Sequence, residues 1–272
     1  MKRHEFLKEL HKVSGNRNYL EIGVNDGRSL RLSRVPTIAV DPAFKVVTEF
    51  RCDVHLVRAT SDDFFARDRP LIHLKGGRHP LRNLRRGRGP LAYWRRTVLD
   101  LSFIDGMHLF EYALRDFMNI ERHSDWTSVI VFDDMLPRNV DEAARDRHTG
   151  AWTGDVYKLA EILGRYRPDL VTVLVDTQPT GQLVVFGADP RSTVLRERYD
   201  EIVAEYEVPD PQKVPETILD RAGAVAPEAL LGAGFWRPLA RARTLRIGRS
   251  RGWEALRTAV EGVGHGRTRL QA

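Results

Sequence analysis

Short apolar runs alternate with amphipathic stretches over about the first 190 residues of this 272-residue chain. An unbroken apolar run of four to eight residues is typical of a buried strand, whereas apolar residues three and four apart indicate one face of a helix. Strands are therefore predicted at 19–22, 37–42, 54–58, 98–106 and 128–134. Helices are predicted at 4–13, at 108–123 and from the capping sequence Ser61-Asp62-Asp63 onward.

Two further apolar runs, at 170–177 and 181–189, flank the turn sequence Pro179-Thr180-Gly181, which predicts an antiparallel hairpin. A helix is predicted over 153–166, with Thr153 as its N-cap. Strands and helices alternate before the hairpin, which is the order of a doubly wound α/β fold. We therefore predict a Rossmann-like, mostly parallel sheet with one antiparallel strand near its edge.

The alternation of apolar runs and amphipathic stretches ends at Asp189. A charged helix is predicted over 192–208, followed by a proline-interrupted linker and an arginine-rich tail. We therefore divide the chain into a ligand-binding domain at 1–190, which carries a basic insert at 67–97, and a helical, arginine-rich extension at 191–272. Two interpretations of the tail stay open, contact with acidic lipids at a membrane surface and disorder.

Composition narrows the class of protein. Hydrophobic residues make up 42% and charged residues 29% of the chain, as in ordinary globular proteins, and no apolar segment approaches the roughly 20 residues of a membrane span. The N-terminal stretch is interrupted by acids and a lysine, so we expect no signal peptide. The single cysteine, Cys52, excludes a disulfide framework and a cysteine-rich metal site, and favours a cytoplasmic protein.

The stretch "YLEIGVNDGRSL" (residues 19–30) ends a predicted strand in a tight turn with glycines at 23 and 27. Such turns present backbone amides to nucleotide-like ligands in α/β proteins. The dinucleotide fingerprint G-x-G-x-x-G is not met, because Asn25 stands where its middle glycine would be. The turn therefore predicts a nucleotide-like ligand without identifying it.

Four segments together resemble the class I S-adenosylmethionine-dependent methyltransferases: "LEIGVNDGRSL", "IAVDP", "LSFIDGMHLFEYALRDF" and "VIVFDDM". The sequence is most similar to a small-molecule branch with an Ile-Asp-Gly-x-His motif, which includes the macrocin-type sugar O-methyltransferases. The resemblance covers residues 18–134 well, becomes looser to about 187, and does not extend into the C-terminal portion.

The resemblance implies S-adenosyl-L-methionine as the cofactor and assigns residues to it. Gly23, Asn25 and Gly27 would let the backbone approach the amino-acid part of the cofactor, and Glu21 would help to organise that end. Asp41, after the second strand, would accept hydrogen bonds from the ribose hydroxyls, and Asp62 would meet the adenine amino group. Asp105 is also expected to contact the cofactor. Asp41 and Asp62 have plain alternatives as a loop initiator and a helix cap.

Asp105, Asp133 and Asp134 end two strands that should be neighbours, about 4.8 Å apart. A hard divalent cation, such as Mg²⁺, would neutralise these carboxylates and bind substrate oxygens, as the resemblance to macrocin-type enzymes implies. His108 is the candidate general base, with Asp105 as its catalytic partner. The alternatives are a metal-free site and a structural histidine.

Two other segments have more than one interpretation. Trp152, with His148 and Asp155, lies in a glycine-rich loop that either overhangs the acceptor pocket or staples the following helix. The basic insert carries Tyr93 and Trp94 together with nine arginines, which include Arg78, Arg82, Arg85, Arg86, Arg88, Arg95 and Arg96. It would clamp acceptor phosphates, bind RNA or remain a solvated loop.

The favoured function is methyl transfer from S-adenosyl-L-methionine to a hydroxyl of a small-molecule or glycan-like acceptor, with Mg²⁺ assistance left open. The alternatives are an RNA methyltransferase and a non-catalytic, cofactor-binding scaffold protein. The sequence leaves the oligomeric state undetermined.

Overall fold

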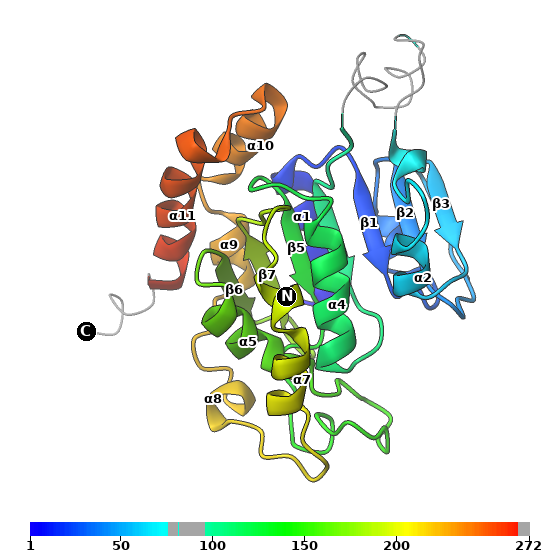
Figure 1. Cartoon of the computed structure of the whole chain (residues 1–272), viewed down its shortest axis with the longest axis vertical. Helices are drawn as coiled ribbons and strands as arrows, with labels where there is room; N and C mark the ends of the chain where they lie inside the picture. The colour runs from blue at the N-terminus through cyan, green and yellow to red at the C-terminus, as the bar shows by residue number, and fades with distance from the viewer. Residues whose placement is uncertain (76–80, 82–95, 266–272) are drawn as a thin grey trace.

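The computed structural model describes residues 1–75, 81 and 96–265, and these form a seven-stranded sheet in the order β3-β2-β1-β4-β5-β7-β6 (Figure 1). Strand β7 is antiparallel to both β5 and β6, and the other pairs are parallel. The predicted fold class, a doubly wound and mostly parallel sheet with one reversed strand near the edge, is therefore confirmed. The strands are β1 (Tyr19–Ile22), β2 (Thr37–Val40), β3 (Val54–Val57), β4 (Leu101–Ile104), β5 (Val129–Phe132), β6 (Val171–Val175) and β7 (Gln182–Phe186).

Helices cover both faces of the sheet. Alternate residues of each central strand point to opposite sides, and both sets are apolar, so both faces need to be buried. In β5, Ile130 and Phe132 pack on one face, whereas Val129 and Val131 pack on the other. The first face is covered by α2 (Ser61–Phe65), α4 (Phe110–Glu121), α5 (Leu159–Tyr166), α6 (Val194–Glu197) and α7 (Tyr199–Tyr206). The second is covered by α1 (Arg3–Ser14), α9 (Pro227–Leu231), α10 (Trp236–Leu245) and α11 (Arg249–His265).

Short helical pieces complete the described chain. They are the 3₁₀ helices η1 (Leu30–Leu32), η2 (Ile72–Leu74) and η4 (Val156–Lys158), and the single helical turn α8 (Glu216–Leu219). No helix of the described residues is both long enough and apolar enough to cross a membrane.

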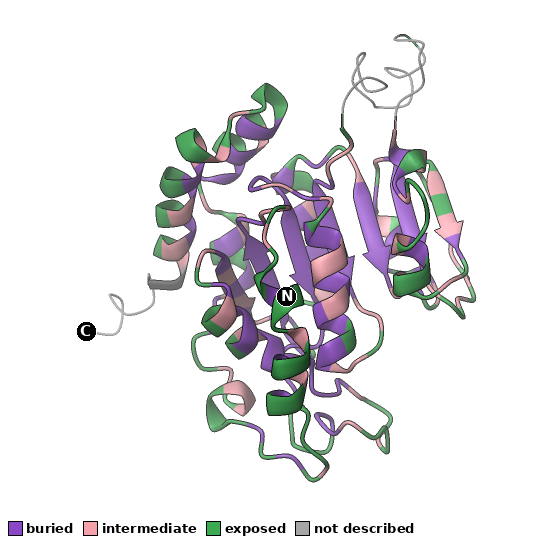
Figure 2. Ribbon diagram, viewed as in Figure 1, coloured by how far each residue is buried: buried purple, intermediate pink, exposed green. Residues whose placement is uncertain are grey.

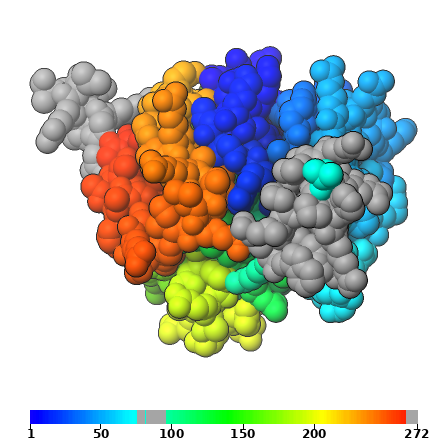
Figure 3. Space-filling view, turned by 90° about the horizontal axis from the view of Figure 1, so that it is seen from above, coloured from blue at the N-terminus to red at the C-terminus, as the bar shows by residue number. Residues whose placement is uncertain are grey.

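The C-terminal helices are part of the layered structure. Trp236, Leu239 and Trp253 are buried in the same apolar cluster as Phe6 of α1 and Phe186 of β7. Figure 2 shows the buried strands between helices whose outer surfaces are exposed, and Figure 3 shows α10 lying beside the N-terminal segment. The described residues after Asp189 therefore include helices that pack on the sheet, while the division of the chain near residue 190 remains a prediction.

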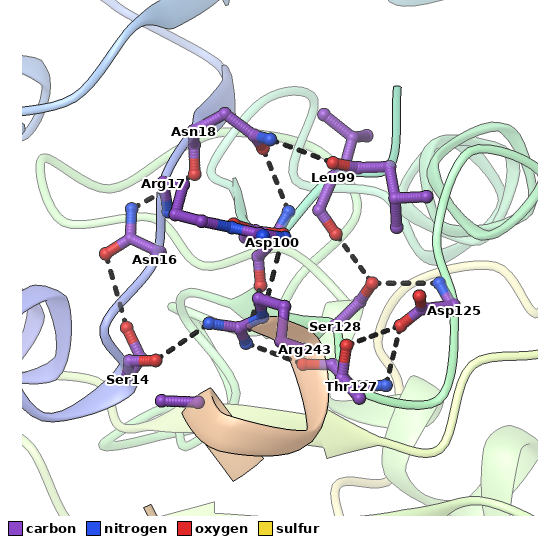
Figure 4. A network of polar contacts seen from close by, with 12 residues as sticks. Ser14, Asn16, Arg17, Asn18, Leu99, Asp100, Asp125, Thr127, Ser128 and Arg243 are labelled. Atoms are coloured by element: carbon purple, nitrogen blue, oxygen red, sulfur yellow. Dashed lines mark hydrogen bonds and ion pairs between the residues drawn. The ribbon is translucent and has the colours of Figure 1, made fainter. Parts of the chain in front are cut away.

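A buried arginine fastens the C-terminal helices to the amino ends of the strands (Figure 4). Arg243 of α10 donates hydrogen bonds to the carbonyl oxygens of Ser14 (2.8 Å) and Thr127 (2.6 Å), and its Nε lies 3.6 Å from the Asp100 carboxylate. Asp100 also accepts two side-chain hydrogen bonds from Arg17, at 2.8 and 3.0 Å. One network therefore joins α1, α10 and the segments that lead into β4 and β5.

Two local predictions are wrong. Thr153 does not cap a helix: its hydroxyl donates to the Glu142 carbonyl oxygen, and α5 begins only at Leu159, after η4. The charged helix expected over 192–208 is two helices, because Arg198 leaves helical geometry (φ −107°, ψ 6°) between α6 and α7.

Most of the basic insert, including Arg78, Arg82, Arg85, Arg86, Arg88, Tyr93, Trp94 and Arg95, lies outside the described residues. Of its arginines, Arg67, Arg69 and Arg96 are described, and Arg96 donates to the Arg122 carbonyl oxygen at 2.9 Å. The tail residues 266–272 also lie outside the described part of the chain. The predictions for the insert remain predictions. The predicted tail begins after Phe235, and disorder is wrong for its described part, which forms α10 and α11. Its contact with lipids remains a prediction.

Register places the candidate residues at one edge of the sheet. Ile22 is level with Val40 of β2 and with Ile104 of β4, and Ile104 is level with Phe132 of β5. The residue that follows each of these, namely Gly23, Asp41, Asp105 and Asp133, therefore begins a loop at the same carboxyl edge. The chain order reverses between β1 and β4, where open α/β sheets bind their ligands.

Candidate active site

A cavity of about 800 Å³ opens at this carboxyl edge, a size that suits a small-molecule ligand. Its walls come from loops after β1, β2, β3, β4 and β5, from the N-terminus of α1 and from the loop before η4. The predicted site residues that line it are Gly23, Asn25, Asp41, Asp62, Asp105, His108 and Asp134. Lining residues that were not predicted include Arg3, Tyr112, Asp116, Arg147 and Thr180.

The turn after β1 needs glycine at its first position. Gly23 has φ +86°, and a Cβ built there would lie 1.8 Å from the carbonyl oxygen of Asp105. Gly27 has φ +82°, and Asn25, with φ +46°, is one of the non-glycine residues in the left-handed region. Since Gly23 lies against the backbone after β4, this turn and the Asp105 loop can be presented to one ligand.

Asp41 holds the same turn in place. Its Oδ2 accepts hydrogen bonds from the amides of Val24 and Asn25, both at 2.8 Å, and its Oδ1 accepts one from the Ala43 amide at 2.6 Å. A carboxylate oxygen accepts about two hydrogen bonds, so Oδ1 can accept one more from a ligand. The structure thus shows that Asp41 holds the loop, while its contact with a ribose remains a prediction.

Glu21 does not line the cavity. Its side chain is buried on the other face of β1, where it accepts hydrogen bonds from the hydroxyls of Tyr19 and Ser29, both at 2.7 Å. Burial raises the pKa of Glu21 to about 8, although both hydroxyl hydrogen bonds oppose the shift. Glu21 therefore does not lie where the expected contact with the cofactor would place it. Its hydrogen bonds instead hold β1 and the segment after the glycine turn together.

Replacing Glu21 with glutamine is expected to stabilise the protein increasingly as pH rises from 5 to 9. The folded protein holds a proton on Glu21 up to about pH 8, whereas the unfolded chain releases it near pH 4.3, so the wild type loses stability through that interval. The gain of the Gln variant should reach a few kcal/mol at pH 9. Urea unfolding of both proteins at several pH values measures it.

Exposed Glu5, on α1, provides the matched control. Glu5→Gln removes an exposed carboxyl group and should change the free energy of unfolding by no more than about 0.5 kcal/mol. A Glu21→Gln difference that does not grow with pH would contradict the proton assignment.

Asp62 lines the cavity, and its carboxylate is already hydrogen-bonded to two side chains of α4. It accepts hydrogen bonds from Arg115 Nε at 3.0 Å and from Asn119 Nδ2 at 3.3 Å. Its neighbour Asp116 also lines the cavity, is 3% exposed, and has its pKa raised by burial to about 7. The sequence pattern could have indicated Asp116, because this acid lies on the apolar face of α4, between Ala113 and Ile120.

Asp105, His108 and Asp134 form the chemical centre of the cavity, with one potential ligand atom from each lying within 4.8 Å of the others. His108 Nε2 is 3.5 Å from Asp105 Oδ1, and its Nδ1 is 3.2 Å from Asp134 Oδ2. Asp134 has φ +61°, and its Oδ1 accepts a hydrogen bond from the Thr180 hydroxyl. Two carboxylates and one imidazole therefore converge on one point.

His108 is protonated at neutral pH in this arrangement. Burial lowers its pKa, but the hydrogen bond with Asp105 and the charge of Asp134 outweigh burial and raise the pKa to about 9. Its Nδ1 also donates to the carbonyl oxygen of Trp152 at 2.8 Å. The predicted role of general base therefore requires a change of charge in the cluster, such as the arrival of a cation, which would favour the neutral imidazole.

Asp133, a predicted metal ligand, lies outside this cluster. Its side chain is 1% exposed, and its Oδ2 accepts a 2.6 Å hydrogen bond from Arg3 Nη1, while Oδ1 is buried with no partner in the described structure. Burial, with the charges of Asp134 and Asp105, raises the pKa of Asp133 well above its ordinary value. The structure therefore replaces the predicted set of three aspartates with two aspartates and His108.

Arg3 brings a positive charge to the acids from the N-terminal helix. Its Nη1 lies 3.9 Å from both Asp105 and Asp134, in addition to the short contact with Asp133. Burial opposes its charge, but these three carboxylates raise the pKa of Arg3 further. No sequence pattern indicates a role for Arg3, since an arginine at the start of a helix is ordinary and the contact spans 130 positions.

The loop before η4 closes one side of the cavity. The indole of Trp152 stacks on the His108 imidazole, with ring centroids 5.1 Å apart and an angle of 7° between planes. Gly154 allows this approach, because a Cβ there would lie 1.6 Å from the His108 carbonyl oxygen. Asp155 is buried and accepts hydrogen bonds from Arg145 and Lys158, while His148 is exposed. Of the two interpretations of Trp152, the structure favours the one that places it at the pocket.

Comparison with known proteins finds no matching family model and no matching curated protein. Among solved structures, the chain is similar to an O-methyltransferase from Bacillus cereus in complex with SAH, the demethylated cofactor (TM-score 0.43, 15% identity, 68% of this chain and 80% of that chain). It is also similar to the O-methyltransferase TomG from Streptomyces achromogenes in complex with SAM (S-adenosylmethionine) (0.44, 16%, 68% and 79%). A third similar structure is cofactor-bound Rv0187 from MTB (0.45, 14%, 70% and 82%). Similarity at this level concerns the path of the chain, so the function proposed below rests on the residues of this chain's own pocket.

Proposed function

We propose that this protein is an S-adenosylmethionine-dependent O-methyltransferase that acts on a hydroxyl of a small-molecule or glycan-like acceptor. The observation that carries the proposal is the convergence, in one cavity, of the Gly23 turn fastened by Asp41 with the cluster of Asp105, His108 and Asp134. The turn offers close backbone approach to a nucleotide-like cofactor. The cluster offers proton acceptors for a hydroxyl.

The reaction that fits these parts is a direct displacement. A lone pair of the acceptor hydroxyl attacks the sulfonium methyl carbon, the carbon–sulfur bond breaks, and the hydroxyl proton passes to a base of the cluster. The products are the methyl ether and S-adenosylhomocysteine. Alignment of the two reactants in a fixed cavity supplies much of the rate enhancement for such a step. Trp152 gives the acceptor side of the cavity a flat apolar surface.

The cluster also fits a divalent cation by its donor chemistry. Asp105 and Asp134 offer the carboxylate oxygens that Mg²⁺ and Mn²⁺ prefer, and His108 offers an imidazole nitrogen, which suits Mn²⁺ and other transition metals better than Mg²⁺. A cation held there would lower the pKa of a coordinated hydroxyl. Thr180, which donates to Asp134, fixes the direction of one of the two carboxylates.

Binding of S-adenosylhomocysteine, measured by isothermal titration calorimetry, tests the proposal. The wild type should bind, and Asp41→Ala should bind at least tenfold more weakly, because it loses both the turn's acceptor and the ribose contact. Asp68→Ala is the matched control, since Asp68 is exposed and lies outside the cavity lining. A wild type that does not bind the compound would exclude the proposed function.

The acceptor is then sought among hydroxyl-bearing small molecules and glycosides, with methylated product detected by mass spectrometry. Asp134→Asn should lower turnover by a factor of roughly 100 or more while leaving cofactor binding within a few-fold, because this residue lies at the proton-accepting end of the cavity. Unchanged turnover in the variant would remove the cluster from the mechanism.

A further inference from the structure

Arg3 and His108 contact different oxygens of the same two carboxylates. His108 lies near Oδ1 of Asp105 and Oδ2 of Asp134, whereas Arg3 Nη1 lies 3.9 Å from Oδ2 of Asp105 and from Oδ1 of Asp134. At 3.9 Å the guanidinium is at the limit of an ion pair and beyond hydrogen-bond distance. A small displacement would therefore bring Arg3 into direct contact with either carboxylate.

Of the three acids near Arg3, Asp133 makes the shortest contact. Its Oδ2 lies 2.6 Å from Arg3 Nη1, and its side chain is immobilised by burial at the end of β5. The backbone of Arg3 is fixed as well, because its amide donates to the Gln178 carbonyl oxygen at 2.9 Å and the Gln178 amide donates to the Met1 carbonyl oxygen at 2.9 Å. The guanidinium is thus anchored at both ends of the side chain.

Arg3 keeps its positive charge, since a guanidinium does not lose its proton in a protein, and a half-buried cation is attracted to nearby carboxylates. Without the 2.6 Å contact to Asp133, the nearest remaining carboxylates would be those of Asp105 and Asp134, and attraction would draw the guanidinium onto them. A guanidinium in direct contact with these two carboxylates would compete for part of their lone pairs and would repel an incoming cation, so the cluster would bind a metal ion more weakly. The side chain that pairs with Arg3 would therefore affect how well the cluster binds a cation.

We propose that Asp133 is a positioning residue that holds Arg3 away from Asp105 and Asp134, and thereby keeps these two carboxylates available to a divalent cation. Asp133 acts on the cation only through Arg3 and is not itself a ligand. The proposal concerns the cation that the cluster fits, and it does not depend on the identity of the organic substrate.

Titration with Mn²⁺ alone, followed by calorimetry on the full-length protein, tests this arrangement. Asp133→Asn should bind Mn²⁺ at least tenfold more weakly than the wild type, because the amide cannot compete with two carboxylates for Arg3. The decisive measurement is the double variant Arg3→Met/Asp133→Asn. With no guanidinium left to block the cluster, it should bind Mn²⁺ as well as the wild type or better.

The double variant separates positioning from ligation. If Asp133 were a ligand, its loss would weaken binding whether or not Arg3 is present, so a double variant as weak as Asp133→Asn would overturn the proposal. Equal binding by Asp133→Asn and the wild type, or a wild type that does not bind Mn²⁺ at millimolar concentration, would also overturn it.

Further variants guard against a folding defect and a non-specific effect. Arg3→Met alone should bind Mn²⁺ at least as tightly as the wild type, and weaker binding by this variant would count against the proposal. Asp68→Asn, at an exposed position, should match the wild type. The Mn²⁺ titrations are made without cofactor, so a failure to bind S-adenosylhomocysteine, which would exclude the proposed function, remains a separate result.

Discussion

Replacing Gly23 with alanine is expected to destabilise the protein by roughly 4 kcal/mol or more, which places it among the most damaging single substitutions. Two independent costs add at this position. The backbone has φ +86°, which is unfavourable for a residue with a Cβ by about 1–2 kcal/mol. The added Cβ would also lie 1.8 Å from the Asp105 carbonyl oxygen and 2.3 Å from its carbonyl carbon.

The overlap cannot be relieved by rotation of a side chain, because the obstructing atoms are backbone. The Asp105 amide is hydrogen-bonded to the Ile22 carbonyl oxygen at 2.8 Å, and the Gly23 amide to the Val40 carbonyl oxygen at 3.0 Å. Separating the two loops would therefore disturb β1, β2 and β4 together. We expect S-adenosylhomocysteine binding to be lost with the fold of this edge.

Gly223 provides a matched control for the backbone cost alone. It has a similar φ of +78°, but no described heavy atom lies within 4 Å of the position of its Cβ. Gly223→Ala should therefore cost only about 1–2 kcal/mol. Urea unfolding of the three proteins gives the comparison, and equal losses for the two variants would show that the contact with Asp105 is unimportant.

Replacing Arg243 with methionine is expected to cost about 3 kcal/mol of unfolding free energy. Removal of one partner of a buried, hydrogen-bonded ion pair typically costs about 3–5 kcal/mol. Arg243 is 4% exposed, and its loss leaves the buried carbonyl oxygens of Ser14 and Thr127 without their donor (Figure 4). We take the lower end of the range, because Arg17 continues to pair with Asp100.

The size of the effect depends on how much of the fold the C-terminal helices support. Burial lowers the pKa of Arg243, although the charge of Asp100 opposes this shift. The buried charge therefore depends on the acceptors around it. Methionine keeps most of the apolar contacts of the arginine stem, so the variant tests loss of the charge and hydrogen bonds rather than loss of packing. The variant should therefore unfold at a lower urea concentration but with an unchanged dependence on urea.

Arg241 is the matched control, since it lies on the same helix and is exposed. Arg241→Met should change the free energy of unfolding by no more than about 0.5 kcal/mol. If Arg243→Met were as mild as Arg241→Met, the buried network would contribute nothing to joining α10 to the sheet.

The two central strands of the site were predictable in place and in type. Apolar runs at 19–22 and 128–134 are too short for helices and too continuous for surface strands, so their interpretation as buried parallel strands needed no tertiary information. The parallel arrangement then forces the residues after each run to one edge. For that reason Gly23, Asp41, Asp105 and Asp134 were found by sequence alone, and all four line the cavity.

The direction of a side chain was not predictable in the same way. Asp133 and Asp134 are adjacent acids at the end of one strand, yet one bonds to Arg3 and the other contacts His108. The difference arises because successive residues of a strand point to opposite sides, and Asp134 then turns with φ +61°. Glu21 likewise faces away from the cavity because of its place in the alternation of β1.

The sequence by itself determined the order of strands and helices, the glycine turn and the acids at the strand ends, because these follow from local periodicity and from the geometry of a parallel sheet. The tertiary structure alone decided which charges meet. Arg3 reaches Asp133 across 130 positions, and Arg243 reaches Ser14 across 229. Such contacts depend on how whole helices pack on the sheet, and packing is decided by the sum of many apolar contacts rather than by any pattern near the residues concerned.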